Sequence, residues 1–230
     1  MTTKELARVT TYISYERLTM TASKTDRRHF LKVSTATLAV GSLASPVIAQ
    51  SSDFDIAAIT APRRLGDDNA PVKVIEYFSM TCSHCGAFHR ETWPDVKTNL
   101  VETGKVQFEM HPFPLDGLAL RAHVMCRLLP NKAYFAMTEI LLKEQKNWVR
   151  AEDPLKALMA YGRQAGISEA RFNAVMRDRP VLEAVVEMRQ QAVDEWQIDS
   201  TPSFVVNNDK KISGGRTYDD FVAELNLSGI

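Results

Sequence analysis

Hydrophobic and polar positions divide the chain after residue 50 into two strand-rich sections separated by a long helical one. The run Val72–Phe78 is dominated by β-branched and aromatic residues and predicts a buried central strand. Apolar residues then recur at helical spacing over residues 83–101, with a kink expected at Pro94, and residues 106–110 alternate as a second strand. This order of strand, helix and strand predicts a parallel pair joined by a right-handed crossover.

Residues 115–196 contain apolar residues at helical intervals and no pattern typical of a strand. A segment of this length is too long for a loop inside a compact domain, so we expect an inserted helical domain over 115–196. The spacing predicts five helices, at residues 118–129, 133–146, 154–165, 168–177 and 181–196.

Strand patterns return at residues 202–207, and a turn at Asn207-Asn208-Asp209 leads to a short run at 211–213 and a closing helix over 218–227. The whole pattern predicts an α/β fold in which a mixed sheet of four to five strands is flanked by helices. The sheet domain then consists of residues 50–114 and 197–230, divided by the insertion.

The candidate chemistry lies in Cys82-Ser83-His84-Cys85, which follows the first strand and opens a helix. Thiols at positions i and i+3 lie one helical turn apart, close enough to form a disulfide or to share a metal. A helix N-terminus stabilises the thiolate that thiol–disulfide exchange requires, so this placement favours a redox site.

The first 49 residues predict an export signal. The sequence Asp26-Arg27-Arg28-His29-Phe30-Leu31-Lys32 resembles a twin-arginine signal, and an uncharged stretch over residues 33–47 follows it. Ala49 and Val47 suit a signal peptidase, so we expect cleavage after Ala49 and a periplasmic mature protein. Export would place the two cysteines in an oxidising compartment.

The charge of the remaining chain bears on its partners. Residues 1–49 hold seven Lys or Arg and three Asp or Glu, which leaves 21 basic and 25 acidic residues downstream. This mildly acidic balance argues against a nucleic-acid partner.

The element order, the cysteine motif, the strand Val72–Phe78 and the segment Ser200-Thr201-Pro202-Ser203-Phe204 together resemble the DsbA family of thiol oxidoreductases. The resemblance covers the chain from about Leu65 onward and implies a thioredoxin fold. It implies that Cys82 is the exposed cysteine that forms the mixed disulfide, that Cys85 is its buried partner, and that the His84 side chain helps to stabilise the Cys82 thiolate. Ser83 departs from the family, where proline is frequent.

The resemblance extends to three residues outside the motif. It implies that Pro202 is a cis-proline facing the cysteines, where substrate backbone pairs as an extra strand, and that Thr201 tunes substrate release. Strand geometry alone leaves open whether Glu76 lies on a solvated face or is buried and paired. The resemblance favours a buried acid under the active site that relays protons.

The resemblance further implies a periplasmic dithiol oxidase that needs no dissociable cofactor, because the Cys82–Cys85 disulfide is the oxidant. Its partners would be exported proteins with free thiols and a membrane quinone-linked oxidase of the DsbB type. We expect a monomer, and the lack of a visible dimerisation domain counts against an isomerase of the dimeric type. A disulfide reductase or isomerase with the same chemistry remains an alternative.

A metal-binding alternative uses other residues. Cys82, Cys85 and His89 could supply three ligands to zinc or Cu(I), although no fourth ligand is evident and we predict no metal site. Cys126 lies on an apolar helical face and is expected to be a packed thiol. His111 and His123 are isolated and are expected to be structural or solvated.

Overall fold

The computed structural model describes residues 52–227, so the predicted export signal and its cleavage site lie outside the described residues. A five-stranded sheet forms the centre of the fold, in the order β1-β3-β2-β4-β5. β2 is parallel to β3 and antiparallel to β4, while β1 and β5 are antiparallel edge strands. The strands are β1 (Arg64–Leu65), β2 (Val72–Phe78), β3 (Val106–Pro112), β4 (Ser203–Val206) and β5 (Lys210–Ser213).

β2 is central because its sequence suits a strand that is covered on both sides. Five of its seven residues are buried, and the other two, Lys73 and Ile75, are partly buried. In the register, Glu76 lies opposite Met110 of β3 and Phe204 of β4. Its carboxylate is therefore held in the middle of the sheet, a few residues before the cysteine motif.

The helix predicted over residues 83–101 forms in three pieces: α2 (Ser83–Glu91), α3 (Trp93–Val96) and the π-helical η1 (Lys97–Val101). The break falls at Thr92, and Pro94 follows in the first turn of α3. Proline lacks the N–H that would continue the hydrogen-bond ladder across this point, which explains the interruption.

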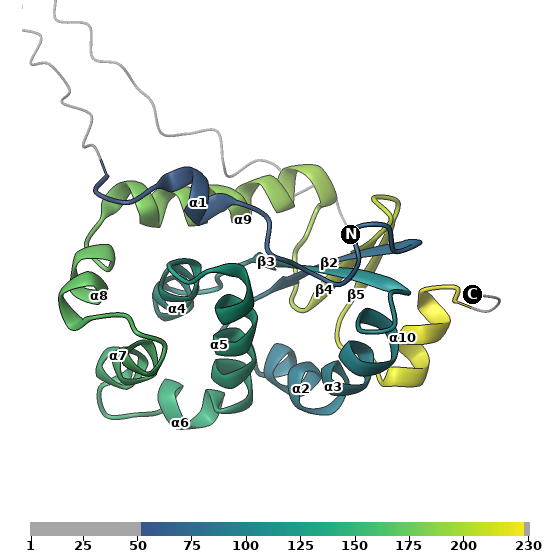
Figure 1. The fold of residues 1–230 in the computed structure, drawn as a ribbon, viewed down its shortest axis with the longest axis horizontal. Coiled ribbons are helices and arrows are strands. Elements are labelled where there is room, and N and C mark those ends of the chain that lie inside the picture. The colour runs from purple at the N-terminus through teal and green to yellow at the C-terminus, as the bar shows by residue number, and fades with distance from the viewer. Residues whose placement is uncertain (1–51, 228–230) are drawn as a thin grey trace, which may run out of the picture. The chain divides into compact units, whose positions relative to one another are not determined.

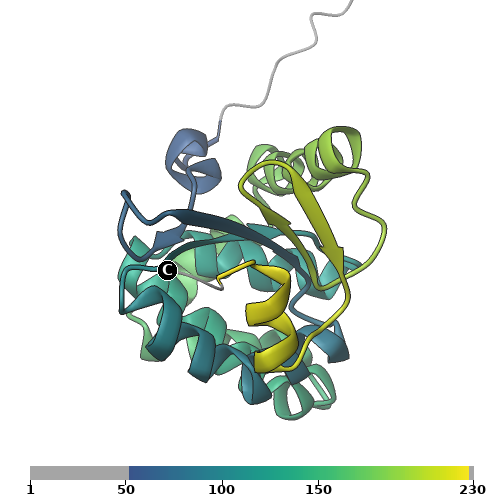
Figure 2. The ribbon, with the colours of Figure 1, turned by 90° about the vertical axis from the view of Figure 1, so that its right-hand side faces the viewer.

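Helices cover both faces of the sheet (Figures 1 and 2). One face is covered by α2, α3 and the closing helix α10 (Tyr218–Glu224), and the other by α9 (Arg179–Trp196), which packs against α1 (Ile56–Thr60). Phe88 of α2, Phe204 of β4 and Phe221 of α10 meet with ring centroids 4.9–5.7 Å apart. This aromatic cluster fastens the motif helix to the sheet.

Between β3 and β4 the chain is helical, and no strand interrupts it. Four of these helices begin with an Asp or Ser side chain that accepts a hydrogen bond from a first-turn amide, at Asp116, Asp153, Ser168 and Asp178. The six helices are α4 (Gly117–Arg127), α5 (Asn131–Lys143), α6 (Gln145–Val149), α7 (Pro154–Gln164), α8 (Glu169–Val175) and α9.

The structure adds short elements that the patterns did not predict. α1 and β1 precede the first predicted strand, and α6 separates from the end of the helix predicted over 133–146. β3 also continues through His111 and Pro112, two residues beyond the strand predicted over 106–110. No helix within residues 52–227 has the length and apolar character needed to cross a membrane.

Candidate active site

The two cysteines of the motif occupy different environments at the start of α2. Cys82 is the N-cap residue, has extended backbone angles and is half-buried, whereas Cys85 lies in the first turn and has no exposed surface. Both are free thiols in this structure. An incoming group can therefore reach the sulfur of Cys82 and not that of Cys85.

Hydrogen bonding lowers the pKa of the Cys82 thiol to about 5. The largest cause of this lowered pKa is a hydrogen bond from the Cys85 thiol. Partial burial raises the pKa, whereas the Thr201 side chain and the backbone N–H groups of Cys85 and His84 lower it further. When Cys82 is protonated, its Sγ–H donates to the Thr201 carbonyl oxygen at 3.3 Å. Among the described residues the buried Thr201 hydroxyl makes no hydrogen bond, so it is available to turn towards the thiolate. Cys82 is thus a thiolate at neutral pH.

Cys85 has the opposite character. Burial raises its pKa well above the usual range, and the hydrogen bond that it gives to Cys82 and the negative charge of Glu76 raise it further. A thiol with this pKa holds its proton tightly. The pair therefore combines one anionic sulfur with one neutral sulfur.

Glu76 is fully buried, which rules out the solvated placement that strand geometry had left open. Its two carboxylate oxygens accept from His89 Nε2 at 3.1 and 2.9 Å, and the His89 side chain is also fully buried. His89 lies one helical turn after Cys85 on α2, which places this pair beneath the active site, and the Glu76 charge raises the pKa of Cys85. The sequence offered His89 as a metal ligand and not as the partner of Glu76.

Ser83 and His84 are exposed. The contribution of His84 to the low pKa of Cys82 comes from its backbone N–H, and among the described residues its imidazole makes no hydrogen bond. This geometry therefore does not show the expected stabilisation of the Cys82 thiolate by the His84 side chain. The reason is local, because the first-turn N–H groups point at the sulfur of the N-cap residue, whereas the side chains of Ser83 and His84 are exposed.

The Thr201–Pro202 peptide bond is cis, as the family resemblance implied. Thr201 contacts Cys82 through its carbonyl oxygen, and the Pro202 carbonyl accepts from the N–H of Gly214 at 2.8 Å. The structure thus brings residue 201 against residue 82, although the whole helical insertion separates them in the chain.

Sequence reasoning missed Gln145, which lies in α6 and is nearly fully buried. Its Nε2 donates to the carbonyl oxygens of Met80 and Cys82 at 2.9 and 2.8 Å. A single glutamine in a helical segment carries no pattern that distinguishes it from a surface residue, so no signal in the sequence identified it.

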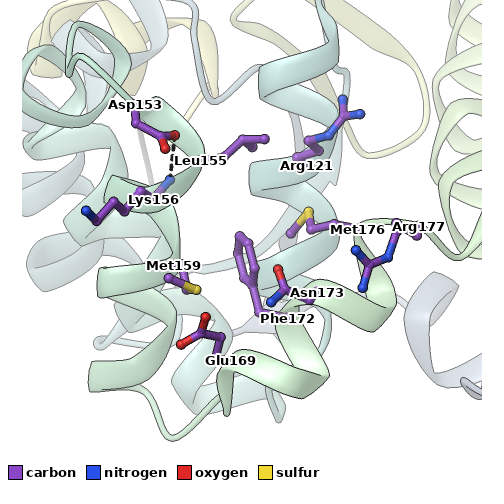
Figure 3. Close-up of a pocket in the computed structure, with 10 residues that line it drawn as sticks. All are labelled: Arg121, Asp153, Leu155, Lys156, Met159, Glu169, Phe172, Asn173, Met176 and Arg177. Carbon is purple, nitrogen blue, oxygen red and sulfur yellow. Dashed lines mark hydrogen bonds between the residues drawn. The ribbon is translucent and has the colours of Figure 1, made fainter.

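Two pockets lie in different parts of the molecule. A groove of about 360 Å³ runs beside His84, between α2 and the segment that leads into α10, and is lined by residues that include Glu91, Arg216 and Tyr218. A pocket of about 550 Å³ lies between α4, α7 and α8, where Met159 and Phe172 face its interior (Figure 3). Only the first pocket includes a residue of the cysteine motif.

The remaining titratable candidates are not arranged for catalysis. Cys126 is fully buried, and burial raises its pKa to about 12, as expected of a packed thiol. Burial lowers the pKa of His111 to about 4 and of His123 to about 3, so both rings are neutral at pH 7. Within residues 52–227, no three His, Cys, Asp or Glu side chains are placed to hold a metal ion.

A comparison with protein families matches residues 59–226 to a family described as thioredoxin. The chain belongs to the thioredoxin family. The match covers most of the chain, including both parts of the sheet and the helices inserted between them.

Relatives of this thioredoxin-family chain have names that refer to disulfide chemistry. A putative protein-disulfide oxidoreductase of Rickettsia bellii is 25% identical over 144 residues, which cover 62% of this chain and 56% of the relative. The chain thus spans little more than half the length of that relative. A probable disulfide bond formation protein D of Bacillus cereus is 30% identical over 82 residues, covering 35% of this chain and 38% of the relative.

Solved structures confirm the DsbA-like form of the fold. The crystal structure of Wolbachia pipientis alpha-DsbA1 superposes with a TM-score of 0.65 at 25% identity, covering 72% of this chain and 89% of that one. The oxidised BdbD of Bacillus subtilis superposes with a TM-score of 0.60 at 20% identity, covering 76% and 95%. The predicted thioredoxin fold and the resemblance to DsbA proteins are both confirmed.

Proposed function

We propose that the protein is a thiol:disulfide oxidoreductase that works as a dithiol oxidase and donates the Cys82–Cys85 disulfide to protein thiols. One observation carries this proposal: an accessible sulfur of low pKa lies next to a buried sulfur of high pKa. A thiolate of low pKa is a good leaving group and stabilises the reduced pair, which makes the disulfide a strong oxidant. The names of the relatives support the same chemistry.

The reaction proceeds in two exchanges. A substrate thiolate attacks Cys82 Sγ of the disulfide, the S–S bond breaks, and Cys85 leaves as a thiolate that takes up a proton. A second substrate thiolate then attacks the substrate sulfur of the mixed disulfide, and Cys82 leaves as a thiolate. The substrate loses two electrons and gains a disulfide, and the Cys82 and Cys85 pair gains the two electrons.

The surroundings of the motif have separate roles in this scheme. Glu76, paired with His89, is the buried acid that exchanges protons with Cys85. Thr201 and Pro202 present backbone beside Cys82 to the substrate chain. Ser83 and His84 are the exposed surface of the motif, and the groove beside His84 offers room for substrate residues next to the reacting cysteine.

The cellular setting follows from the sequence and the family resemblance. The twin-arginine-like segment supports export to the periplasm, where substrates would be exported proteins with free thiols. A membrane quinone-linked oxidase of the DsbB type would restore the disulfide, and no dissociable cofactor would take part. We propose that the protein acts as a monomer.

A first experiment tests the chemistry. Oxidised protein is mixed with a reduced dithiol peptide, and disulfide formation in the peptide is followed by mass spectrometry. Cys82→Ser should abolish the reaction, while Cys126→Ser, which alters only the packed thiol, should retain it. Unchanged activity of Cys82→Ser would end this proposal.

A second experiment tests the direction of the reaction. Thiol trapping in living cells reports whether Cys82 and Cys85 are held as a disulfide or as thiols. An oxidase is expected to be found mostly oxidised, because its partner recharges it. A pair found mostly reduced would favour a reductase or isomerase.

A further inference from the structure

Among residues 52–227, Gln145 is the one inserted-helix side chain that donates to the backbone of the active-site loop. Its exposed fraction is 6%, and Nε2 donates to the carbonyl oxygens of Met80 and Cys82 at 2.9 and 2.8 Å. The two acceptors flank Thr81, so one amide group fixes both peptide planes of the turn that leads from β2 into α2. Both N–H groups of the Gln145 amide are used in this way.

The close approach of Gln145 depends on Gly86, the residue after Cys85. A Cβ atom added to Gly86 would lie 2.8 Å from Gln145 Oε1, well inside van der Waals contact. The backbone N–H of Gly86 also donates to the Cys82 carbonyl oxygen at 3.0 Å. The absence of a side chain at residue 86 therefore lets the Gln145 amide lie directly against the first turn of α2.

The inserted helices hold the same loop at a second point. Thr81 Oγ1 donates to Asp116 Oδ2 at 2.6 Å, and Asp116 Oδ1 accepts from the N–H of Ala119 in the first turn of α4. The loop is thus bonded to the start of α4 through a hydroxyl group and to α6 through two carbonyl groups. The insertion holds the backbone around Cys82 from two separate helices.

The direction of the Cys82 side chain depends on this backbone. The carbonyl group that Gln145 holds and the Cβ that carries Sγ are attached to neighbouring atoms of one residue, so a turn of the peptide plane moves the sulfur. Sγ must stay where the N–H groups of His84 and Cys85 and the Cys85 thiol can donate to it. We propose that Gln145 is a positioning residue, which fixes the Cys82 peptide plane and so holds Sγ over the N-terminus of α2. The role proposed for Gln145 rests on the proposed function, because it takes the Cys82 sulfur as the reacting group.

The experiment compares Gln145→Met with Gln164→Met. Methionine keeps the length and volume of glutamine and removes the two donors, and Gln164 is an exposed glutamine of α7 in the same insertion. The pKa of Cys82 is measured in the reduced proteins from the pH dependence of its alkylation by iodoacetamide, and folding is checked by thermal unfolding. We expect Gln145→Met to raise this pKa by about one unit, which is about tenfold in the thiolate equilibrium, and Gln164→Met to leave it unchanged.

A second variant separates positioning from folding. Gln145→Glu keeps the side-chain shape and sets an oxygen against the two carbonyl groups, so its effect on the Cys82 pKa should be at least as large. A folded Gln145→Met protein with the wild-type pKa overturns the proposal, and so does loss of folding in both variants, which would make Gln145 a structural residue. Iodoacetamide needs no protein substrate. A wild-type protein that failed to oxidise dithiols would therefore defeat the proposed function without affecting this result.

Discussion

Replacing Thr201 by valine removes one hydroxyl group beside the Cys82 sulfur and leaves the shape of the side chain nearly unchanged. The Thr201 hydroxyl is buried and makes no hydrogen bond to another described residue, and its proximity to the sulfur is one cause of the low pKa of Cys82. We expect Thr201→Val to raise the pKa of Cys82 and to make the Cys82–Cys85 disulfide a weaker oxidant.

The size of the effect follows from the energy of one hydrogen bond. A hydrogen bond to a charged group contributes about 1.5–3 kcal/mol, and solvent screening of the half-exposed sulfur favours the lower end of this range. About 1.4 kcal/mol equals one pKa unit, so the pKa should rise by about one unit from its value of about 5. At pH 7 the thiolate still dominates in both proteins, and the reduction potential should fall by about 30 mV.

Two measurements check this prediction. The ultraviolet absorbance of the thiolate gives the pKa as a function of pH, and equilibration with a glutathione buffer gives the reduction potential. Thr201→Ser keeps the hydroxyl group and should stay close to the wild type in both. A folded Thr201→Val protein with unchanged pKa and potential would refute the assignment of the Thr201 hydroxyl to the thiolate.

Three further predictions concern pH, the buried acid and the core. The lowered pKa of Cys82 stabilises the folded, reduced protein. This contribution is fully present when the pH is above the unfolded thiol pKa of about 8.5, and it is lost as the pH falls through about 5. The melting temperature of the reduced protein, measured relative to Cys82→Ser, should therefore fall between about pH 8 and pH 5, and a constant difference would contradict the thiolate. Glu76→Gln removes a charge that raises the pKa of Cys85, so NMR titration of the Cys85 Cβ should give a lower pKa than in the wild type. An unchanged Cys85 pKa would mean that Glu76 does not act on the active site. Phe204→Ala opens a cavity between Phe88 and Phe221 and should lower the free energy of unfolding in urea by about 3–5 kcal/mol, whereas a loss below about 1 kcal/mol would mean that the cluster contributes little.

Much of the fold was predictable because its long elements carry strong periodic patterns. The apolar run of β2 and the helical spacing of the insertion identified the sheet and its interruption, and the cysteine motif indicated the two cysteines that are proposed to react. β1 was not predictable, because two residues, Arg64 and Leu65, are too few to show alternation. It is a strand only because β3 offers it an edge to pair with.

The contacts around the cysteines were predictable only in part. The family resemblance supplied the position of Pro202, and Glu76 was singled out because a carboxylate is unusual in an apolar strand. The partner of Glu76 was not predictable, since pairing with His89 depends on how α2 packs over β2. For His84, the family resemblance implied a side-chain effect, whereas the position at the helix N-terminus makes its backbone N–H the group that acts.

The contact between Cys82 and Thr201 spans 119 positions of the chain. During synthesis and folding, such a distant contact forms late, since the intervening helices must first be made and ordered. Until Thr201 reaches the sulfur, Cys82 lacks one of the hydrogen bonds that lower its pKa. A partly folded chain therefore carries a Cys82 thiol whose pKa is lowered less strongly than in the folded protein. The insertion thus ties the full acidity of Cys82 to completion of the segment that follows the inserted helices.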